Sequence, residues 1–328
     1  MTYHEKTKLI GGEQELPKND YYYGITNSGR SSLRWLILSL ELSGKTILIP
    51  DFVCQIVIDV LLEFEVKIQF YSVDDTFEFS LPRTLTNIDA IYLVRYFGHS
   101  SGALTSVLEQ TDRTVIIDDV FGIDTLEVKA NVSWGYFNSL RKITPISDFS
   151  QIICSKPLID IEHLKLSDFS RLKYKAKEKK HAFIYNNDGN EVSYLELFAQ
   201  AEMLLDNSHG IFAPEDKSIY YVGCYLKNIV PEVNIRQQNL SIAKANLKPT
   251  QYIDIKPSFP SFLPLIVRNR DVIRKYLMKE NIFLAVHWPK TTLANNNLSE
   301  NILSLPLDGR YNETDIKYIC YLISKLDV

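Results

Sequence analysis

Short runs of β-branched and apolar residues alternate with longer segments of helical spacing over the first two thirds of the chain. This alternation is typical of a mainly parallel sheet covered by helices, so we expect an α/β fold. The predicted strands are 46–49, 67–72, 90–94, 114–117, 134–138 and 151–154, and helices are predicted at 31–42 and 52–64. In such a sheet, ligands bind just beyond the carboxyl ends of the strands, which is where chemistry should collect.

The final third mixes helical and strand patterns and predicts a smaller second layer. Apolar spacing is helical at 193–206 and 234–248, and again at 271–279 and 313–325. Strands are predicted at 262–267 and 282–286, on either side of the helix 271–279. We therefore divide the chain into a large domain, 1–233, and a linking helix with a small C-terminal α+β domain, 234–328.

Composition and charge exclude several classes of protein. The chain has 328 residues, 45% of them hydrophobic, and a net charge of −4, so it can bury a large core and offers no basic surface of the size that binds nucleic acid. No apolar run approaches the roughly 18–20 residues that span a bilayer, and the N-terminus lacks a signal-peptide pattern, so we expect a cytoplasmic protein. The four cysteines, with no CxxC pair and no nearby histidine, predict free thiols and no metal site.

A turn at Ser28–Ser32 precedes the first predicted helix. The free backbone N–H groups and the dipole of a helix N-terminus form an anion site, which a phosphate could occupy. Serine and glycine at such a place also simply cap a helix, and the residues alone leave both interpretations open.

Two adjacent acids, Asp118 and Asp119, follow the predicted strand 114–117. One side chain can point toward a ligand and the other toward the sheet or solvent. A carboxylate facing a pyridine nitrogen would suit pyridoxal phosphate, because it keeps the ring protonated as an electron sink. The alternative is a turn aspartate that bonds to its own backbone.

A third candidate is the segment from Ser139 to Lys142, beyond the strand 134–138. The lysine amine could form an imine with an aldehyde and then move protons, while the serine hydroxyl could hold a phosphate. In a chain with 36 lysines and arginines, however, a single lysine is usually a solvated surface charge.

The order of these segments resembles the DegT/StrS-type sugar aminotransferases, which are pyridoxal-phosphate enzymes of the aspartate-aminotransferase fold type I. SGRSSLRWLI resembles the family's SGxxAL segment, VIIDDVFG its IEDxAQ segment and SLRKITPISDF its lysine segment. ILIPDFVCQIVIDVLL, AIYLVRYFGHSSG, VNIRQQNLSIAKANL, FLPLIVRNRDVIRKYLMKENIFLAVHWP and LSLPLDGRYNETDIKYI resemble further family segments in the same order. The resemblance runs nearly end to end.

The resemblance implies roles for individual residues. Lys142 would be the lysine that carries the cofactor, and Asp119 would be the partner of the ring nitrogen. The remaining implied cofactor contacts are Ser139 and the backbone amides of Arg30 and Ser31 at the phosphate, with Gly29 beside them, Cys54 over the ring, and Asn234 reaching the neighbouring subunit's phosphate. A homodimer with shared active sites is thereby implied.

Departures from the family pattern concern activity rather than fold. Gly122 stands where the family has Gln or His, and Phe149-Ser150 replace paired glycines behind the lysine. The sequence leaves open whether His99 and His287 reach the site or are structural.

The resemblance implies transfer of an amino group, from a donor such as glutamate, to a keto-sugar carried on a nucleotide, in amino-sugar or polysaccharide biosynthesis. In the family, a histidine in place of the lysine marks sugar dehydratases, so Lys142 favours transamination. Two alternatives stay open: a catalytically altered or inactive protein of this fold acting as a binding or regulatory module, and a pyridoxal-phosphate enzyme with a non-sugar acceptor.

Overall fold

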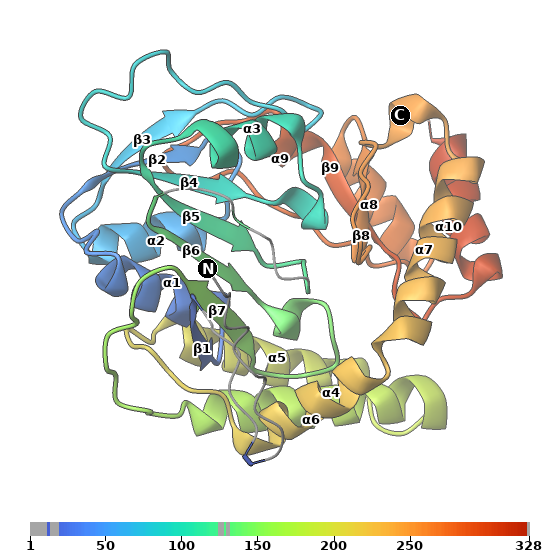
Figure 1. Cartoon of the computed structure of the whole chain (residues 1–328). Coiled ribbons are helices and arrows are strands. Elements are labelled where there is room, and N and C mark those ends of the chain that lie inside the picture. The colour runs from blue at the N-terminus through green and yellow to red at the C-terminus, as the bar shows by residue number, and fades with distance from the viewer. Residues whose placement is uncertain (1–11, 14–19, 124–127, 129–131, 327–328) are drawn as a thin grey trace, which may run out of the picture.

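A seven-stranded sheet forms the centre of the molecule (Figure 1). The computed structural model describes residues 12–13, 20–123, 128 and 132–326. In spatial order the strands are β1 (Tyr22–Thr26), β7 (Ser150–Cys154), β6 (Trp134–Asn138), β5 (Thr114–Asp119), β4 (Ala90–Val94), β2 (Thr46–Pro50) and β3 (Lys67–Tyr71). Strands β3, β2, β4, β5 and β6 are parallel, and β7 is antiparallel to both of its neighbours. The mainly parallel sheet expected from the sequence is confirmed.

The chain changes direction across the sheet between β2 and β4. From β2 it passes to β3 at one edge, and β4 then pairs with the other side of β2. Such a switch point opens a crevice at the carboxyl ends of the strands, where ligands bind in open α/β sheets.

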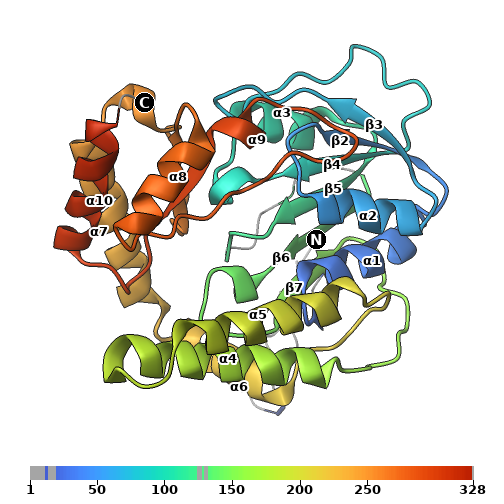
Figure 2. The same cartoon turned by 180° about the vertical axis from the view of Figure 1, so that it is seen from behind.

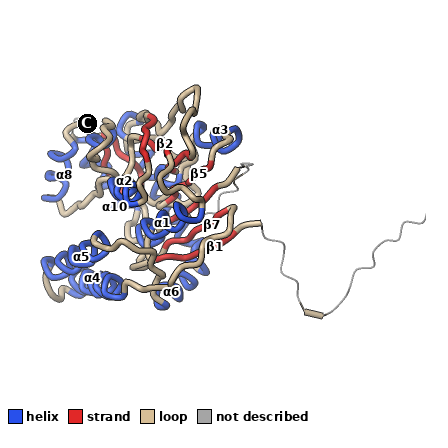
Figure 3. The backbone as a smooth tube through the Cα atoms, turned by 90° about the vertical axis from the view of Figure 1, so that its left-hand side faces the viewer, coloured by secondary structure: helices blue, strands red, loops and turns tan. Residues whose placement is uncertain are grey.

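Helices cover the sheet and extend beyond its β1 edge. Helix α1 (Gly29–Ser39) packs on β6, β7 and β1 and against α2 (Gln55–Glu63), while α3 (Gly102–Gln110) follows β4. Figures 1 to 3 agree that α4 (Ser167–Asn186), α5 (Glu191–Asp206) and α6 (Asp216–Lys227) lie together beside β7 and β1. Short 3₁₀ helices η1 (Tyr96–Gly98) and η2 (Leu140–Lys142) follow β4 and β6 directly.

The C-terminal part forms a lobe at the carboxyl ends of the central strands (Figure 2). Strand β8 (Phe262–Ile266) pairs antiparallel with β9 (Ile302–Pro306). Around them lie α7 (Ile229–Asn246), η3 (Pro249–Gln251), α8 (Arg270–Lys279), α9 (Leu298–Asn301) and α10 (Glu313–Lys325). The Ser261 hydroxyl donates to the carbonyl of Phe121 at 3.1 Å, and the Asn296 amide donates to Asp51 Oδ1 at 2.7 Å, so the lobe is tied to the ends of the central strands.

Most predicted elements are present, and the differences have physical reasons. The strand predicted at 282–286 is wrong: Ala285 makes a single bridge to Ser304, and β9 is the partner of β8. The predictions omitted the strands β1 and β9 and the helices α3, α4, α6 and α9. Helix α4, which contains the charged run 171–181, buries only Phe169, Ser170 and Ala176, so it has little apolar periodicity to detect.

The predicted division at residue 233/234 stays a prediction, and it falls inside α7. No helix in the described part of the chain is long and apolar enough to cross a membrane.

Candidate active site

A cavity of about 660 Å³ lies at the carboxyl ends of the central strands. Its walls come from the start of α1, residues along the length of α2, the ends of β5 and β6, η2, the end of α5 with the loop after it, and Trp288 of the C-terminal lobe. Of the site residues predicted from the sequence, it is lined by Gly29, Arg30, Cys54, Ser139 and Lys142. Ser31, Asp119 and Asn234 are not among its lining residues.

Lys142 is the last residue of η2, and its backbone N–H donates to the Ser139 carbonyl at 2.9 Å. Lys142 lines the cavity and is an exposed residue, so its side chain is accessible to a ligand there. Burial lowers the pKa of the Lys142 amine, while the neighbouring Cys54 and Asp118 act in the opposite direction. A lowered pKa increases the fraction of neutral amine, which is the nucleophilic form.

The two adjacent acids lie on opposite faces of β5, because successive side chains of a strand alternate. Asp118 lines the cavity, where its carboxylate accepts hydrogen bonds from the Tyr92 hydroxyl at 2.6 Å and the Val120 N–H at 3.2 Å. Burial raises the pKa of Asp118 to about 6, although the hydrogen bonds from Tyr92 and Val120 and the charge of Lys142 oppose this rise. At neutral pH the group facing Lys142 is therefore mainly a carboxylate.

Asp119, to which the resemblance gave the ring-nitrogen role, is fully buried on the other face. Its Oδ2 accepts from Arg95 Nη1 at 2.9 Å and from the Tyr136 hydroxyl at 3.1 Å. Burial raises the pKa of Asp119 to about 7, although the Arg95 cation opposes this rise. The structure thus places Asp118, and not Asp119, in the cavity.

The position of Asp119 also explains why residue 122 is glycine. A Cβ built on Gly122 would lie 2.0 Å from Asp119 Oδ2, so no side chain fits there while Asp119 keeps this conformation. If Asp118 is instead aligned with the family's acid, the family's Gln or His position falls on Phe121. That ring is buried and stacks on Phe97, with centroids 5.5 Å apart.

Some polar groups of the turn before α1 form hydrogen bonds with one another. The Ser28 hydroxyl caps the helix by accepting from the Ser31 N–H at 3.5 Å, and the Ser31 hydroxyl donates to Asn27 Oδ1 at 2.8 Å. The Ser31 side chain is thereby used within the turn. Gly29 and Arg30 border the cavity, and a Cβ on Gly29 would lie 3.2 Å from the Phe137 ring, so the helix start packs closely on β6.

The polar groups at this end of the cavity fit a phosphorylated cofactor. The Ser139 hydroxyl is buried and lacks a hydrogen-bond partner, as does Nε of Arg141. A phosphate would supply the acceptors that buried donors require, beside a helix N-terminus that favours negative charge. Pyridoxal phosphate is therefore compatible with the residues present, with Ser139, Gly29 and Arg30 at its phosphate.

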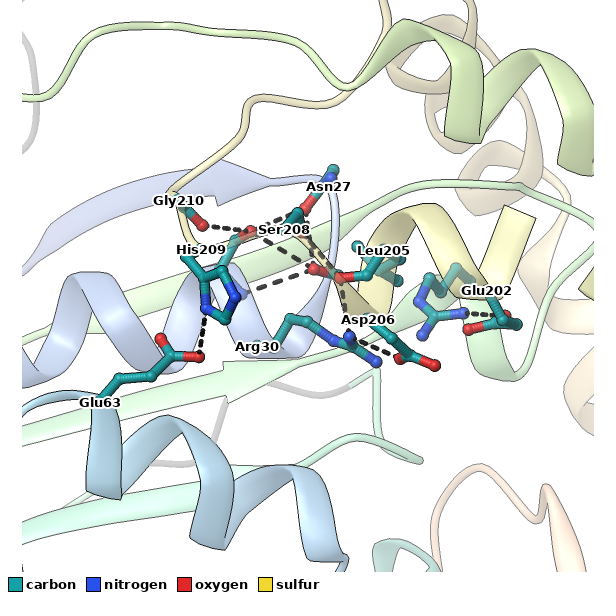
Figure 4. Close-up of polar contacts among 12 residues, drawn as sticks. Asn27, Arg30, Glu63, Glu202, Leu205, Asp206, Ser208, His209 and Gly210 are labelled. Atoms are coloured by element: carbon teal, nitrogen blue, oxygen red, sulfur yellow. Dashed lines mark hydrogen bonds and ion pairs between the residues drawn. The ribbon is translucent and has the colours of Figure 1, made fainter. Parts of the chain in front are cut away.

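Residues from α5 and the loop after it also line the cavity, and the sequence analysis did not identify them (Figure 4). Arg30 Nη1 donates to Asp206 Oδ1 at 2.8 Å and to the Leu205 carbonyl at 2.9 Å. Glu202 pairs with Arg141 at 3.3 Å and with Lys173. Burial would raise the pKa of Glu202, but these two cations outweigh it and lower the pKa to about 2.

The remaining predicted positions lie around the site rather than in it. His287 is bonded through Nδ1 to the Ser304 hydroxyl at 2.8 Å, and burial, followed by the nearby Lys142, lowers its pKa to about 3, so this imidazole is neutral. His99 Nδ1 accepts from the Lys256 N–H at 3.4 Å. Asn234 is exposed on α7. None of the three lines the cavity formed by the described residues.

Phe149 and Ser150, which replace the expected glycines, are part of the packed core. Phe149 is buried, and Ser150 begins β7 and bonds the Ser32 hydroxyl at 2.6 Å. Among the described residues, no group of three or more His, Cys, Asp or Glu side chains could hold a metal ion.

Comparison with solved structures identifies the fold. DesV of S. venezuelae, solved with a ketimine intermediate, aligns with 92% of this chain and 84% of its own length, with 10% identity and a TM-score of 0.63. Helicobacter pylori PseC, an aminotransferase of pseudoaminic acid biosynthesis, aligns with 93% of this chain and 86% of its own, with 13% identity and a TM-score of 0.64.

A dehydratase is similar to the same degree. E. coli GDP-4-keto-6-deoxy-D-mannose-3-dehydratase, solved with hydrated pyridoxal phosphate, aligns with 92% of this chain and 87% of its own, with 13% identity and a TM-score of 0.61. No protein-family model and no curated protein sequence matches the chain. The chain has the fold of the pyridoxal-phosphate-dependent sugar aminotransferases, as the resemblance predicted.

Proposed function

We propose that this protein is a pyridoxal-phosphate-dependent aminotransferase that moves an amino group, from a donor such as glutamate, to a keto-sugar nucleotide in amino-sugar or polysaccharide biosynthesis. The observation that carries the proposal is the placement of Lys142 and Asp118 in one cavity, beside the unpartnered hydroxyl of Ser139. A nucleophilic amine, a buried carboxylate and a phosphate-binding end are what this cofactor requires.

Each of these residues has a distinct task in the proposed reaction. Pyridoxal phosphate, when bound, supplies an aldehyde for the amine and a ring that takes up electrons from the substrate carbon. Lys142 would hold the cofactor and, once released, carry a proton at Nζ. Asp118 would keep the ring nitrogen protonated, so it replaces Asp119 in this proposal. Ser139 and the start of α1 would fix the phosphate, and Cys54 at the start of α2 would border the ring.

The lysine distinguishes transamination from dehydration. The fold is shared with a sugar dehydratase, so the fold alone does not separate the two activities. The presence of Lys142 in the cavity supports transamination, because a base at this position can return the proton that completes amino transfer.

The acceptor and the assembly are proposed from the neighbours and from one exposed residue. PseC is an aminotransferase involved in the biosynthesis of pseudoaminic acid, and another neighbour, DesI, was solved with its TDP-sugar product. Both support a keto-sugar nucleotide as the acceptor. Because Asn234 is exposed on α7 and does not line the cavity of its own chain, it is available to a second subunit. We infer a cytoplasmic homodimer in which Asn234 contacts the partner's cofactor phosphate.

The residues that depart from the family pattern, and that favour the binding-module alternative, lie outside the cavity lining. Gly122 is required by the position of Asp119, and Phe149 and Ser150 are buried in the packing around β7. The catalytic proposal is therefore the better supported one.

Glutamate should react once with each cofactor-loaded site in the absence of an acceptor. We expect the visible absorbance band of the bound cofactor to disappear and about one equivalent of 2-oxoglutarate to form per site. A coupled assay for 2-oxoglutarate measures this, with the cofactor-free protein as the control. If the loaded protein forms no keto acid from its donor, neither 2-oxoglutarate from glutamate, nor oxaloacetate from aspartate, nor pyruvate from alanine, the aminotransferase proposal fails and the binding-module alternative becomes the better account.

A further inference from the structure

An exposed histidine, His209, lies at the rim of the cavity, and neighbouring residues fix its position. His209 lies in the loop after α5, lines the cavity together with Glu63, and has 72% of its side chain exposed. Its loop runs back to the turn before α1, where the Phe212 carbonyl accepts from the Asn27 N–H at 2.7 Å. The imidazole is thus accessible to a ligand in the cavity, while its backbone is fixed.

Arg34 of α1 binds the groups around His209 and Glu63, the two residues that lie side by side in Figure 4. Its guanidinium donates to the carbonyls on both sides of the histidine, Ser208 at 2.9 Å and Gly210 at 3.1 Å. The same group binds both carboxylate oxygens of Glu63, at 2.7 and 2.8 Å, and only 3% of its side chain is exposed. Glu63 Oε1 then holds His209 Nδ1 at 3.2 Å. One buried arginine thereby fixes both the loop and the ring.

This arrangement sets the hydrogen-bonding character of the imidazole. An ionised carboxylate only accepts hydrogen bonds, so His209 Nδ1 is the donor to Glu63. In the neutral ring Nε2 then carries a lone pair, and it is an acceptor toward the cavity. The two other acids of the rim are also acceptors: Asp59, whose Oδ1 is bonded by Gln55 at 2.8 Å, and Asp206, with 60% of its side chain exposed.

The charge at the rim disfavours a diphosphate. Here Asp59, Glu63 and Asp206 outnumber the two cations Arg30 and Arg34, and both cations are already paired with carboxylates. Like charges at short range repel, so a second dianionic group, in addition to the cofactor phosphate proposed at the start of α1, is unfavourable at this end. A ring bearing several hydroxyl donors matches the available acceptors.

We propose that Asp59, Asp206 and His209 form a hydroxyl-binding subsite that selects the sugar ring of the acceptor. This inference rests on the proposed function, since it assigns the orientation of a sugar nucleotide within the same cavity. The sugar ring lies against the rim made by α2 and the loop after α5, and the diphosphate lies away from it. His209 is then a specificity-determining residue.

Binding of sugar nucleotides and their free diphosphates tests the subsite. Dissociation constants are measured by calorimetry for three pairs: UDP-N-acetylglucosamine and UDP, dTDP-glucose and dTDP, and GDP-mannose and GDP. In the wild type we expect at least one sugar nucleotide to bind about fivefold or more tighter than its diphosphate, as one or two net hydrogen bonds would give. In His209→Ala the preference for that sugar nucleotide over its diphosphate, expressed as the ratio of the two dissociation constants, should largely disappear, while the dissociation constant of the diphosphate stays within twofold of the wild type.

Two further variants separate a contact from a structural effect. His209→Gln retains an acceptor oxygen and should recover part of the ratio, whereas His163→Ala, at another exposed histidine, should not change it. The proposal is overturned if no sugar nucleotide binds more tightly than its diphosphate, if the ratio is unchanged in His209→Ala, or if that variant loses affinity for the diphosphate instead. The glutamate reaction of the wild type is measured independently of these ratios, so failure of the catalytic proposal is distinguishable from failure of the subsite.

Discussion

The variant Asp118→Asn should react with glutamate at least about 100-fold more slowly than the wild type. The carboxylate that lines the cavity would lose its charge, and the ring nitrogen would lose the partner that keeps it protonated. Tyr92 and Val120 donate to different oxygens of Asp118. In the variant the single amide oxygen can accept from the Val120 N–H, and the amide nitrogen can donate to the Tyr92 hydroxyl, so the local structure should persist. Single-turnover loss of the cofactor band, followed by stopped-flow absorbance, measures the rate.

Asp119→Asn is the matched control for this prediction. Its side chain lies on the opposite face of β5, so the glutamate reaction of the folded fraction should change by less than about tenfold. A thermal melt establishes the folded fraction of each variant. If Asp119→Asn is the slow variant and Asp118→Asn is close to wild type, Asp119 is the ring partner and the proposed assignment is incorrect.

The variant Arg95→Met should unfold more easily by about 3 kcal/mol at pH 8.5, because it leaves the buried carboxylate of Asp119 without its cation. The pKa of Asp119, about 7 when folded, lies above the roughly 4 of an unfolded chain. The folded protein therefore binds more protons, and this group's contribution to stability is lost as the pH rises through about 7. Without Arg95 that pKa rises further, so the deficit should be larger at pH 8.5 than at pH 6.

Urea unfolding at the two pH values measures this deficit. The double variant Arg95→Met with Asp119→Asn has no carboxylate at position 119. Its loss of unfolding free energy relative to the single variant Asp119→Asn should therefore not depend on pH. An Arg95→Met deficit that is equal at pH 6 and pH 8.5 would show that packing, and not the charge of Asp119, determines the loss.

The central sheet could be predicted from the sequence because its strands are buried on both faces. In β4 and β6 every residue is buried, so AIYLV and WGYFN appear as continuous apolar runs. Edge strand β1 and the charged helix α4 lack such a signal. The pairing of β8 with β9 joins segments 302–306 and 262–266, and local patterns do not specify which segments pair.

The candidate site was only partly predictable for a related reason. Residues that follow strands or begin helices, such as Lys142 and Arg30, can be placed from local patterns alone. The choice between Asp118 and Asp119 depends on where β5 ends: it extends to Asp119, two residues beyond the predicted strand, and the alternation inside it decides which carboxyl faces the cavity. His209 and Glu63 are in contact although they are 146 positions apart in the sequence, and no local motif links the two.

The most direct test of the account is to identify the residue that binds pyridoxal phosphate. The loaded protein is reduced with borohydride, which fixes the cofactor on its lysine, and is then digested and mapped by mass spectrometry. The account predicts one pyridoxyl-modified residue, Lys142, and no modification in Lys142→Ala at equal cofactor concentration. Modification of another lysine, or equal modification of the wild type and Lys142→Ala, would contradict the assignment of this cavity as the active site.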